Sequence, residues 1–135
     1  MHITIIGTGY VGLVTGACFA EMGNHVTCID VDQRKLDDLN KGLIPIYEPG
    51  LEDIVKRCFD EGLLKFSSSL SDAMKSSDVY FIAVGTPPGE DGSADLKFVI
   101  SVAEEIGDNL DKYAVIVDKS TINDRDIREL WLYIY

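Results

Sequence analysis

The stretch ITIIGTGYVG, residues 3–12, decides the fold of this 135-residue chain. Its first four residues form an apolar run, which is typical of a β-strand buried on both faces of a sheet. Gly7 follows directly, and residues 10–22 then carry small side chains that allow a helix to pack closely on that sheet. The stretch therefore predicts a strand, a tight glycine turn and a helix, in that order.

Three glycines in this turn have the spacing G-x-G-x-x-G, at Gly7, Gly9 and Gly12. In this context the first glycine permits the tight turn, the second lets a pyrophosphate approach the backbone, and the third lets helix and strand pack closely. The helix N-terminus adds free N–H groups and a partial positive charge. That local field explains how a chain with a net charge of -11 can hold an anionic dinucleotide.

An acidic residue, Asp30, ends the second predicted strand, at residues 25–29. It follows Gly12 at roughly the 20-residue interval that dinucleotide-binding motifs show. A carboxylate there accepts hydrogen bonds from an adenosine ribose diol and disfavours a 2′-phosphate, so it indicates NAD rather than NADP. Lys35 lies in the next predicted helix, where contact with the ribose or phosphate and a purely solvated role both stay open.

Helices and strands alternate along the chain, which predicts a Rossmann-like, doubly wound, mainly parallel α/β sheet flanked by helices. The expected strands are residues 3–6, 25–29, 64–66, 79–84 and 114–117. The expected helices are residues 10–22, 32–41 and 51–61, a short one opened by Ser71 and Asp72, and residues 95–109.

Loops that follow the strands of such a sheet gather at one edge, where ligands bind. Thr86 and Thr121 follow two of these strands, and Glu48 lies in the proline-containing loop 43–50. For Thr86 and Thr121, ligand contact and a place in an ordinary polar loop are equally open. Glu48 either faces a substrate or belongs to a purely structural turn.

The charge and cysteine content exclude several classes of function. Twelve Lys and Arg against 23 Asp and Glu leave no general attraction to nucleic acid or to an anionic membrane. No run approaches the ~20 apolar residues of a membrane span, and the first residues lack a signal-peptide pattern. Cys18, Cys28 and Cys58 lack C-x-x-C spacing, so we expect small buried hydrophobes in a cytoplasmic protein, with no disulfide framework and no metal site.

The last segment, residues 122–135, differs in character from the rest. Ile127, Leu130, Trp131 and Ile134 form one apolar helical face, so the segment predicts an amphipathic C-terminal helix that Asn123 or Asp124 could cap. Two roles stay open for this tail. It covers apolar surface of the domain, or it drives homo-oligomerisation through its exposed aromatic and apolar side chains.

Four segments resemble the N-terminal NAD-binding domain of the UDP-glucose/GDP-mannose dehydrogenase family. They are GTGYVGLVTGACFAEMGNHVTCIDVD, IPIYEPGLE, SDVYFIAVGTPPGEDGSADL and VIVDKST. The last three together are far more specific than the glycine motif. The resemblance covers about residues 1–121 and looks nearest to the UDP-glucose 6-dehydrogenase branch, with GDP-mannose and UDP-N-acetylmannosamine dehydrogenases as alternatives.

The resemblance implies a chemistry and a set of site residues. Family members oxidise the C6 alcohol of a nucleotide sugar to a carboxylate with two NAD, through a thiohemiacetal on a cysteine. Carried over to this chain, the NAD site is lined by Tyr10, Val11, Asp30, Lys35, Thr86 and Thr121. Thr121 also takes the family's position for placing a water or hydroxyl near the reacting carbon, which makes it the expected catalytic residue.

The chain also departs from the family pattern. In the family, VDKST continues into a Pro-Val-Gly segment and a substrate domain that carries the nucleophilic cysteine, whereas here it continues as INDRDIRELWLYIY. We therefore expect an NAD-binding domain at residues 1–121, truncated after VDKST, and a non-family tail at residues 122–135. Such a chain alone is not expected to catalyse. A degenerate binding or self-association module, or an enzyme completed by a separate chain, are the alternatives.

Overall fold

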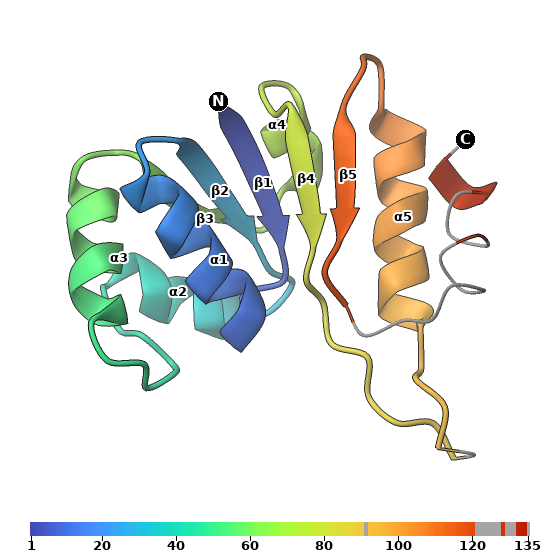
Figure 1. The fold of residues 1–135 in the computed structure, drawn as a ribbon, viewed down its shortest axis with the longest axis horizontal. Helices are drawn as coiled ribbons and strands as arrows, with labels where there is room; N and C mark the ends of the chain where they lie inside the picture. Colours follow the sequence, from blue (N-terminus) through green and yellow to red (C-terminus); the bar gives the residue numbers. More distant parts are fainter. Residues whose placement is uncertain (91, 121–127, 129–131, 135) are drawn as a thin grey trace.

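The computed structural model describes residues 1–90, 92–120, 128 and 132–134. Five parallel strands form one sheet in the order β3-β2-β1-β4-β5, with helices on both faces (Figure 1). The strands are β1 (His2–Ile6), β2 (His25–Ile29), β3 (Leu64–Ser67), β4 (Val79–Ile82) and β5 (Val115–Asp118). The helices are α1 (Tyr10–Glu21), α2 (Gln33–Asn40), α3 (Leu51–Asp60), α4 (Leu70–Met74) and α5 (Lys97–Asn109). The predicted Rossmann-like, doubly wound architecture is confirmed.

Most element boundaries lie within two residues of the sequence prediction, and the start of α4 differs for an identifiable reason. The prediction placed the helix start at Ser71 and Asp72, but the helix begins at Leu70. Its N-cap is Ser69, whose hydroxyl oxygen accepts a hydrogen bond from the Asp72 amide. Several serines precede this helix, and only the backbone conformation of the folded chain selects which one caps it.

Two hydrophobic clusters lie on opposite faces of the sheet. One joins β1, β2 and β3 to α1, α2 and α3, and includes Ile5, Leu13 and Leu36. The other joins β1, β2 and β4 to α4 and α5, and includes Ile6 and Tyr80. Because the chain changes faces after β3, the strand order reverses between β1 and β4, which is where ligands bind in sheets of this class.

Gly16 brings α1 into direct contact with β2. A Cβ atom added to Gly16 would lie 2.6 Å from the Cys28 Sγ atom, whereas its next neighbours would be at 3.5 Å or more. We expect Gly16→Ala to lower the free energy of unfolding by about 1–2 kcal/mol, because one buried sulfur atom must move. Chemical denaturation measures this loss.

Cys28→Ala supplies the matched control because it removes the clashing sulfur. The double variant Gly16→Ala/Cys28→Ala should lose less stability than the sum of the two single variants. Additive losses would show that the contact between α1 and β2 is not what requires a glycine at position 16.

The three cysteines do not share one environment. Cys28 and Cys58 are buried, as expected, but Cys18 is exposed, and the expectation for Cys18 was wrong. Cys18 lies on α1, whose residues Ala17 and Ala20 face the core instead. Burial raises the pKa of the Cys28 thiol to about 12, so this thiol stays protonated and is a core side chain rather than a nucleophile.

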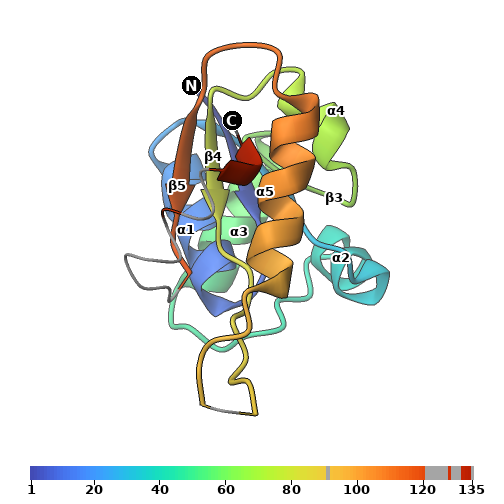
Figure 2. The ribbon, with the colours of Figure 1, turned by 90° about the vertical axis from the view of Figure 1, so that its right-hand side faces the viewer.

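Residues 132–134 lie beside α5 (Figures 1 and 2). Ile134 packs against the second cluster, and a Cβ on Gly107 would lie 2.5 Å from the carbonyl oxygen of Tyr133. Residues 121–127, 129–131 and 135 are outside the described residues, and with them most of the predicted C-terminal helix and both of its predicted caps. Among the described residues, no helix is both long enough and apolar enough to cross a membrane.

Candidate functional site

The glycine turn joins the ends of the three central strands. Gly7 has a φ of +103°, and its amide donates to the carbonyl of Ile29 at the end of β2, at 2.7 Å. A Cβ on Gly7 would lie 2.6 Å from the carbonyl oxygen of Ala83, just beyond β4. Gly12 is more confined still, because its Cβ would lie 1.8 Å from the Gly7 carbonyl oxygen. The predicted roles of the first and third glycines are thus visible as backbone contacts.

The second glycine has the opposite surroundings. A Cβ built on Gly9 would meet no atom within 4 Å. Gly9 is the N-cap of α1 and provides no side-chain hydrogen bond to the first turn, which begins with the exposed residues Tyr10 and Val11. Open space above a helix N-terminus with uncapped amides fits a diphosphate, which needs close approach and several N–H donors.

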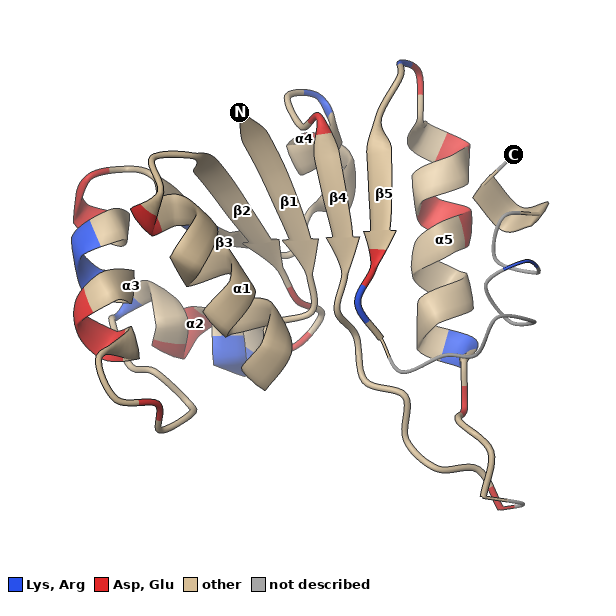
Figure 3. Ribbon diagram, viewed as in Figure 1, with Lys and Arg blue, Asp and Glu red and all other residues tan. Residues whose placement is uncertain are grey.

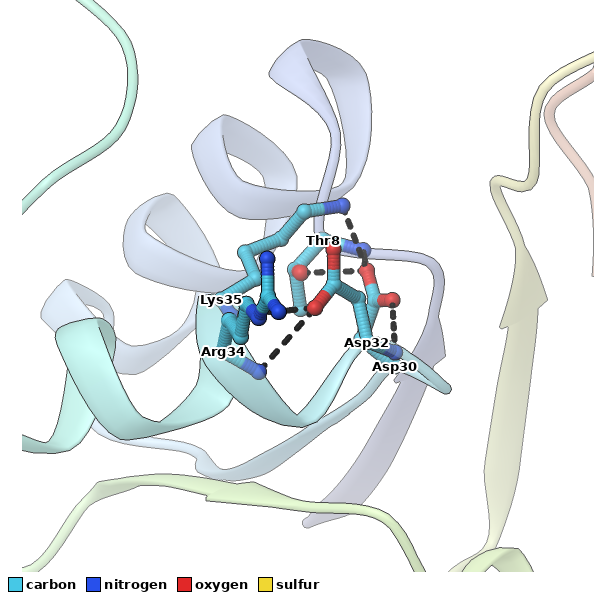
Figure 4. Close-up of polar contacts among 5 residues, drawn as sticks. All are labelled: Thr8, Asp30, Asp32, Arg34 and Lys35. Atoms are coloured by element: carbon cyan, nitrogen blue, oxygen red, sulfur yellow. Dashed lines mark hydrogen bonds and ion pairs between the residues drawn. The ribbon is translucent and has the colours of Figure 1, made fainter.

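The carboxylate of Asp30 lies beside this turn and is held by four donors (Figure 4). Its Oδ2 accepts from the Thr8 amide at 2.9 Å, the Thr8 hydroxyl at 2.5 Å and the Lys35 ammonium at 3.0 Å. Its Oδ1 accepts from the Asp32 amide at 3.0 Å. The structure therefore brings the predicted residues Asp30 and Lys35 together next to the glycine turn.

These contacts set the charge of Asp30. Burial raises the pKa of this carboxyl. The hydrogen bonds from the Thr8 hydroxyl, the amides of Asp32 and Thr8, and the Lys35 ammonium lower it by a larger amount, so the resulting pKa is about 2. Asp30 is thus an anion at every physiological pH. An ionised carboxylate accepts hydrogen bonds only, and it repels a phosphate placed against it.

Asp32 fixes the start of α2 and with it the position of Lys35. Its side chain accepts from the amides of Arg34 at 3.0 Å and Lys35 at 3.3 Å, which makes it the N-cap of the helix. The first turn of α2 therefore carries the Lys35 ammonium to Asp30 (Figure 4). Asp32 and Thr8 were not among the predicted site residues, and Thr8 occupies a position that the motif leaves free.

Tyr10 and Glu48, predicted to contact cofactor and substrate respectively, contact each other. The Tyr10 hydroxyl donates to a carboxylate oxygen of Glu48, which ties the loop before α3 to the start of α1. The same hydrogen bond raises the pKa of Tyr10, because a phenolate would face a carboxylate. Glu48 also borders an open cavity of about 500 Å³ in this loop, which Glu52 and Asp53 line as well and which Asp30 does not reach.

The loops after β4 and β5 approach each other at the same edge of the sheet. The Ser120 hydroxyl donates to the Val84 carbonyl at 3.1 Å, and the Ser120 amide donates to Asp118. Burial raises the pKa of Asp118, whose Oδ2 has no hydrogen-bond partner in the part of the chain that the structure describes. Thr86 lies half-buried in the loop after β4, and Thr121 is outside the described residues, so their site roles stay predictions.

Acidic residues are spread over the fold, on α3, on α5 and in connecting loops, and α3 carries basic residues as well (Figure 3). Within residues 1–90, 92–120, 128 and 132–134, no three potential metal ligands form a group that could hold an ion. With a net charge of -11 the chain has no overall attraction for an anion, so the donors that this site offers to one are the backbone amides of the glycine turn.

A parallel sheet with a glycine turn after its central strand, and with an ionised acidic residue after the next strand, defines a dinucleotide-binding domain of the Rossmann type. Comparison with protein families agrees with this class. The model described as "UDP-glucose/GDP-mannose dehydrogenase family, NAD binding domain" matches residues 1–134, and the chain belongs to this family. The match extends past residue 121, and the domain boundary that we expect there stays a prediction.

Individual members of this family are similar to the chain in sequence and in structure. Over 122 residues the chain is 52% identical to a UDP-glucose 6-dehydrogenase of Pseudomonas aeruginosa, which is 90% of this chain but 27% of the relative. A solved GDP-mannose dehydrogenase from Pseudomonas aeruginosa superimposes with a TM-score of 0.93 at 34% identity, covering 99% of this chain and 31% of that one. A UDP-glucose dehydrogenase from Pyrobaculum islandicum gives 0.89 at 36% identity, covering 98% and 32%. The chain thus spans about a quarter to a third of these relatives' length.

Proposed function

We propose that this chain binds NAD across the carboxyl ends of β1 and β4 and forms the cofactor half of a nucleotide-sugar dehydrogenase of the UDP-glucose type. The observation that carries the proposal is the Asp30 carboxylate, ionised and held beside the glycine turn by Thr8, Asp32 and Lys35. The family match and the identity to UDP-glucose 6-dehydrogenases support the choice of cofactor and of substrate class.

Each part of the site has a distinct task in this function. The open space above Gly9 and the first amides of α1 receive the diphosphate. Asp30 accepts a hydrogen bond from the adenosine ribose and excludes a 2′-phosphate, while Lys35 holds the carboxylate and offsets part of its charge. NAD, when bound, supplies the acceptor for the hydride that leaves the alcohol carbon of the substrate.

We propose that the groups that act on the substrate come from the part of the relatives' length that this chain does not span. Two of the three cysteines, Cys28 and Cys58, are not suited to act as the nucleophile, because both are buried and burial raises the pKa of both thiols. We propose that the chain contributes Thr86 and Thr121 to the nicotinamide end, and Glu48 to the substrate end, of a site that further residues complete.

Calorimetric titration of the 135-residue chain with NAD and with NADP tests the proposal. We expect NAD to bind more tightly than NADP, and Asp30→Ala to weaken NAD binding at least about tenfold, because a hydrogen bond to a charged group is lost. The same variant should narrow the difference between the two dinucleotides, since the repulsion of the 2′-phosphate disappears.

Asp38→Ala is the matched control. Asp38 is exposed on α2, the helix that follows Asp30, and its replacement removes an equal charge from a side chain outside the Asp30 hydrogen-bond cluster. Its NAD affinity should equal that of the wild type. Tighter binding of NADP than of NAD, or full NAD affinity in Asp30→Ala, would contradict the proposal.

A further inference from the structure

The side chain of Thr8 makes a contact that the glycine motif itself does not require. Thr8 lies between the first two glycines, at a position that the motif leaves free, yet it is 1% exposed. Its hydroxyl donates to Asp30 Oδ2 at 2.5 Å, and its amide donates to the same oxygen at 2.9 Å. Any residue except proline offers the amide at this position, whereas the second bond needs a side-chain donor, here the Thr8 hydroxyl.

The two oxygens of the Asp30 carboxylate are unequal as a result (Figure 4). Oδ2 receives three donors, two from Thr8 and one from Lys35, whereas Oδ1 receives only the Asp32 amide. A carboxylate oxygen offers about two lone-pair sites. Oδ2 is therefore saturated from within the protein, and the remaining acceptor site is on Oδ1.

We propose that Thr8 is a positioning residue that holds Asp30 with Oδ2 toward the glycine turn and Oδ1 toward the adenosine ribose, and thereby sets the preference for a dinucleotide without a 2′-phosphate. This inference rests on the proposed NAD site. Thr8 and Lys35 approach the carboxylate from different elements, the turn after β1 and the helix α2, so together they fix its rotation. Removal of the Thr8 hydroxyl leaves Lys35 and the two amides, and the carboxylate gains freedom to rotate.

A set of three substitutions tests Thr8. Thr8→Val removes the hydroxyl at nearly constant shape, Thr8→Ala removes it without a methyl group against the carboxylate, and Thr8→Ser keeps it. We expect the first two to weaken NAD binding about five- to twentyfold, in the range of one lost hydrogen bond to a charged group. The ratio of NADP to NAD dissociation constants should shrink, and Thr8→Ser should stay within about twofold of wild type.

Two readouts separate positioning from a loss of folding. In an Asp30→Ala background, Thr8→Val should no longer change NAD affinity, because the two residues act as one unit. The acid limb of NAD affinity should also move to higher pH in Thr8→Val, since the hydroxyl lowers the pKa of Asp30. Melting curves show whether each variant is folded, and Thr8→Ala replaces Thr8→Val if the valine variant is not.

An NMR titration of the Asp30 carboxyl carbon in the nucleotide-free protein distinguishes failure of this inference from failure of the proposed function. Thr8→Val and Thr8→Ala should raise the pKa of Asp30 above about 2, and Thr8→Ser should not. If the wild type binds no NAD, the proposed function fails, and this titration alone decides the positioning role. Folded Thr8→Val with wild-type NAD affinity, cofactor ratio and Asp30 titration overturns the inference.

Discussion

Gly12→Ala should lower the free energy of unfolding by more than about 3 kcal/mol, because the new methyl group would overlap backbone atoms of the glycine turn. The new Cβ would lie 1.8 Å from the carbonyl oxygen of Gly7 and 2.9 Å from its carbonyl carbon. Both are backbone atoms of a residue whose amide is bonded to Ile29 at 2.7 Å, so neither can move without opening the junction of β1 and β2. Chemical denaturation and a melting curve measure the loss.

Gly9→Ala is the matched control within the same turn. Gly9 has a φ of -70°, which alanine adopts without strain, and a Cβ there meets no atom within 4 Å. We expect this variant to be as stable as the wild type within about 0.5 kcal/mol. It should nevertheless bind NAD more weakly, because the added methyl group occupies space that the diphosphate approaches. A Gly12→Ala protein with wild-type stability would contradict the close contact between α1 and the turn.

Asp30→Asn should lower the free energy of unfolding at pH 7 by about 2 kcal/mol. The folded protein depresses the pKa of Asp30 from 3.8 to about 2, and each unit of difference corresponds to about 1.4 kcal/mol. Asn keeps the shape of the side chain but removes the charge that Thr8 and Lys35 stabilise. The Asp30 side chain is only 10% exposed, so solvent screens these interactions weakly.

The pH dependence of this difference has a definite sign. A depressed carboxyl pKa contributes stability that is fully present above the unfolded value of 3.8 and is lost as the pH falls toward 2. The stability curves of the wild type and Asp30→Asn should therefore be parallel above about pH 5 and converge between about pH 4 and pH 2. Asp38→Asn removes the same charge from an exposed site and should stay close to the wild type throughout. A constant difference down to pH 2 would contradict the ionisation argument.

Local patterns predicted most of the fold because each depends on neighbours in the chain. The apolar run before Gly7 and the stop at Gly23 place β1 and α1 within one residue of their observed bounds. The exposure of Cys18 was predicted wrongly, and α4 begins one residue before the predicted Ser71. In both cases several positions satisfy the local rule equally well, and packing chooses among them.

The candidate site, like the fold, was predicted from the sequence only in part. The glycine spacing and the acidic residue after β2 identify Asp30 from the sequence, because a strand, a turn and a helix bring them together within one structural unit. The family could also be identified from the sequence, since the segments around YEPGL and GTPPGEDGSADL are specific in themselves. The roles expected for Thr86, Thr121 and Glu48 come from resemblance and loop position, and they stay predictions.

By itself, then, the sequence determined the order of strands and helices, the glycine turn, the acidic residue Asp30 after the second strand and the family to which the chain belongs. Only the tertiary structure decided that Thr8 saturates one oxygen of Asp30, and that Tyr10 meets Glu48 across the start of α1. The physical reason is that these contacts join separate elements. Their distances and angles depend on how rigid helices and strands pack, and no short pattern along the chain records that packing.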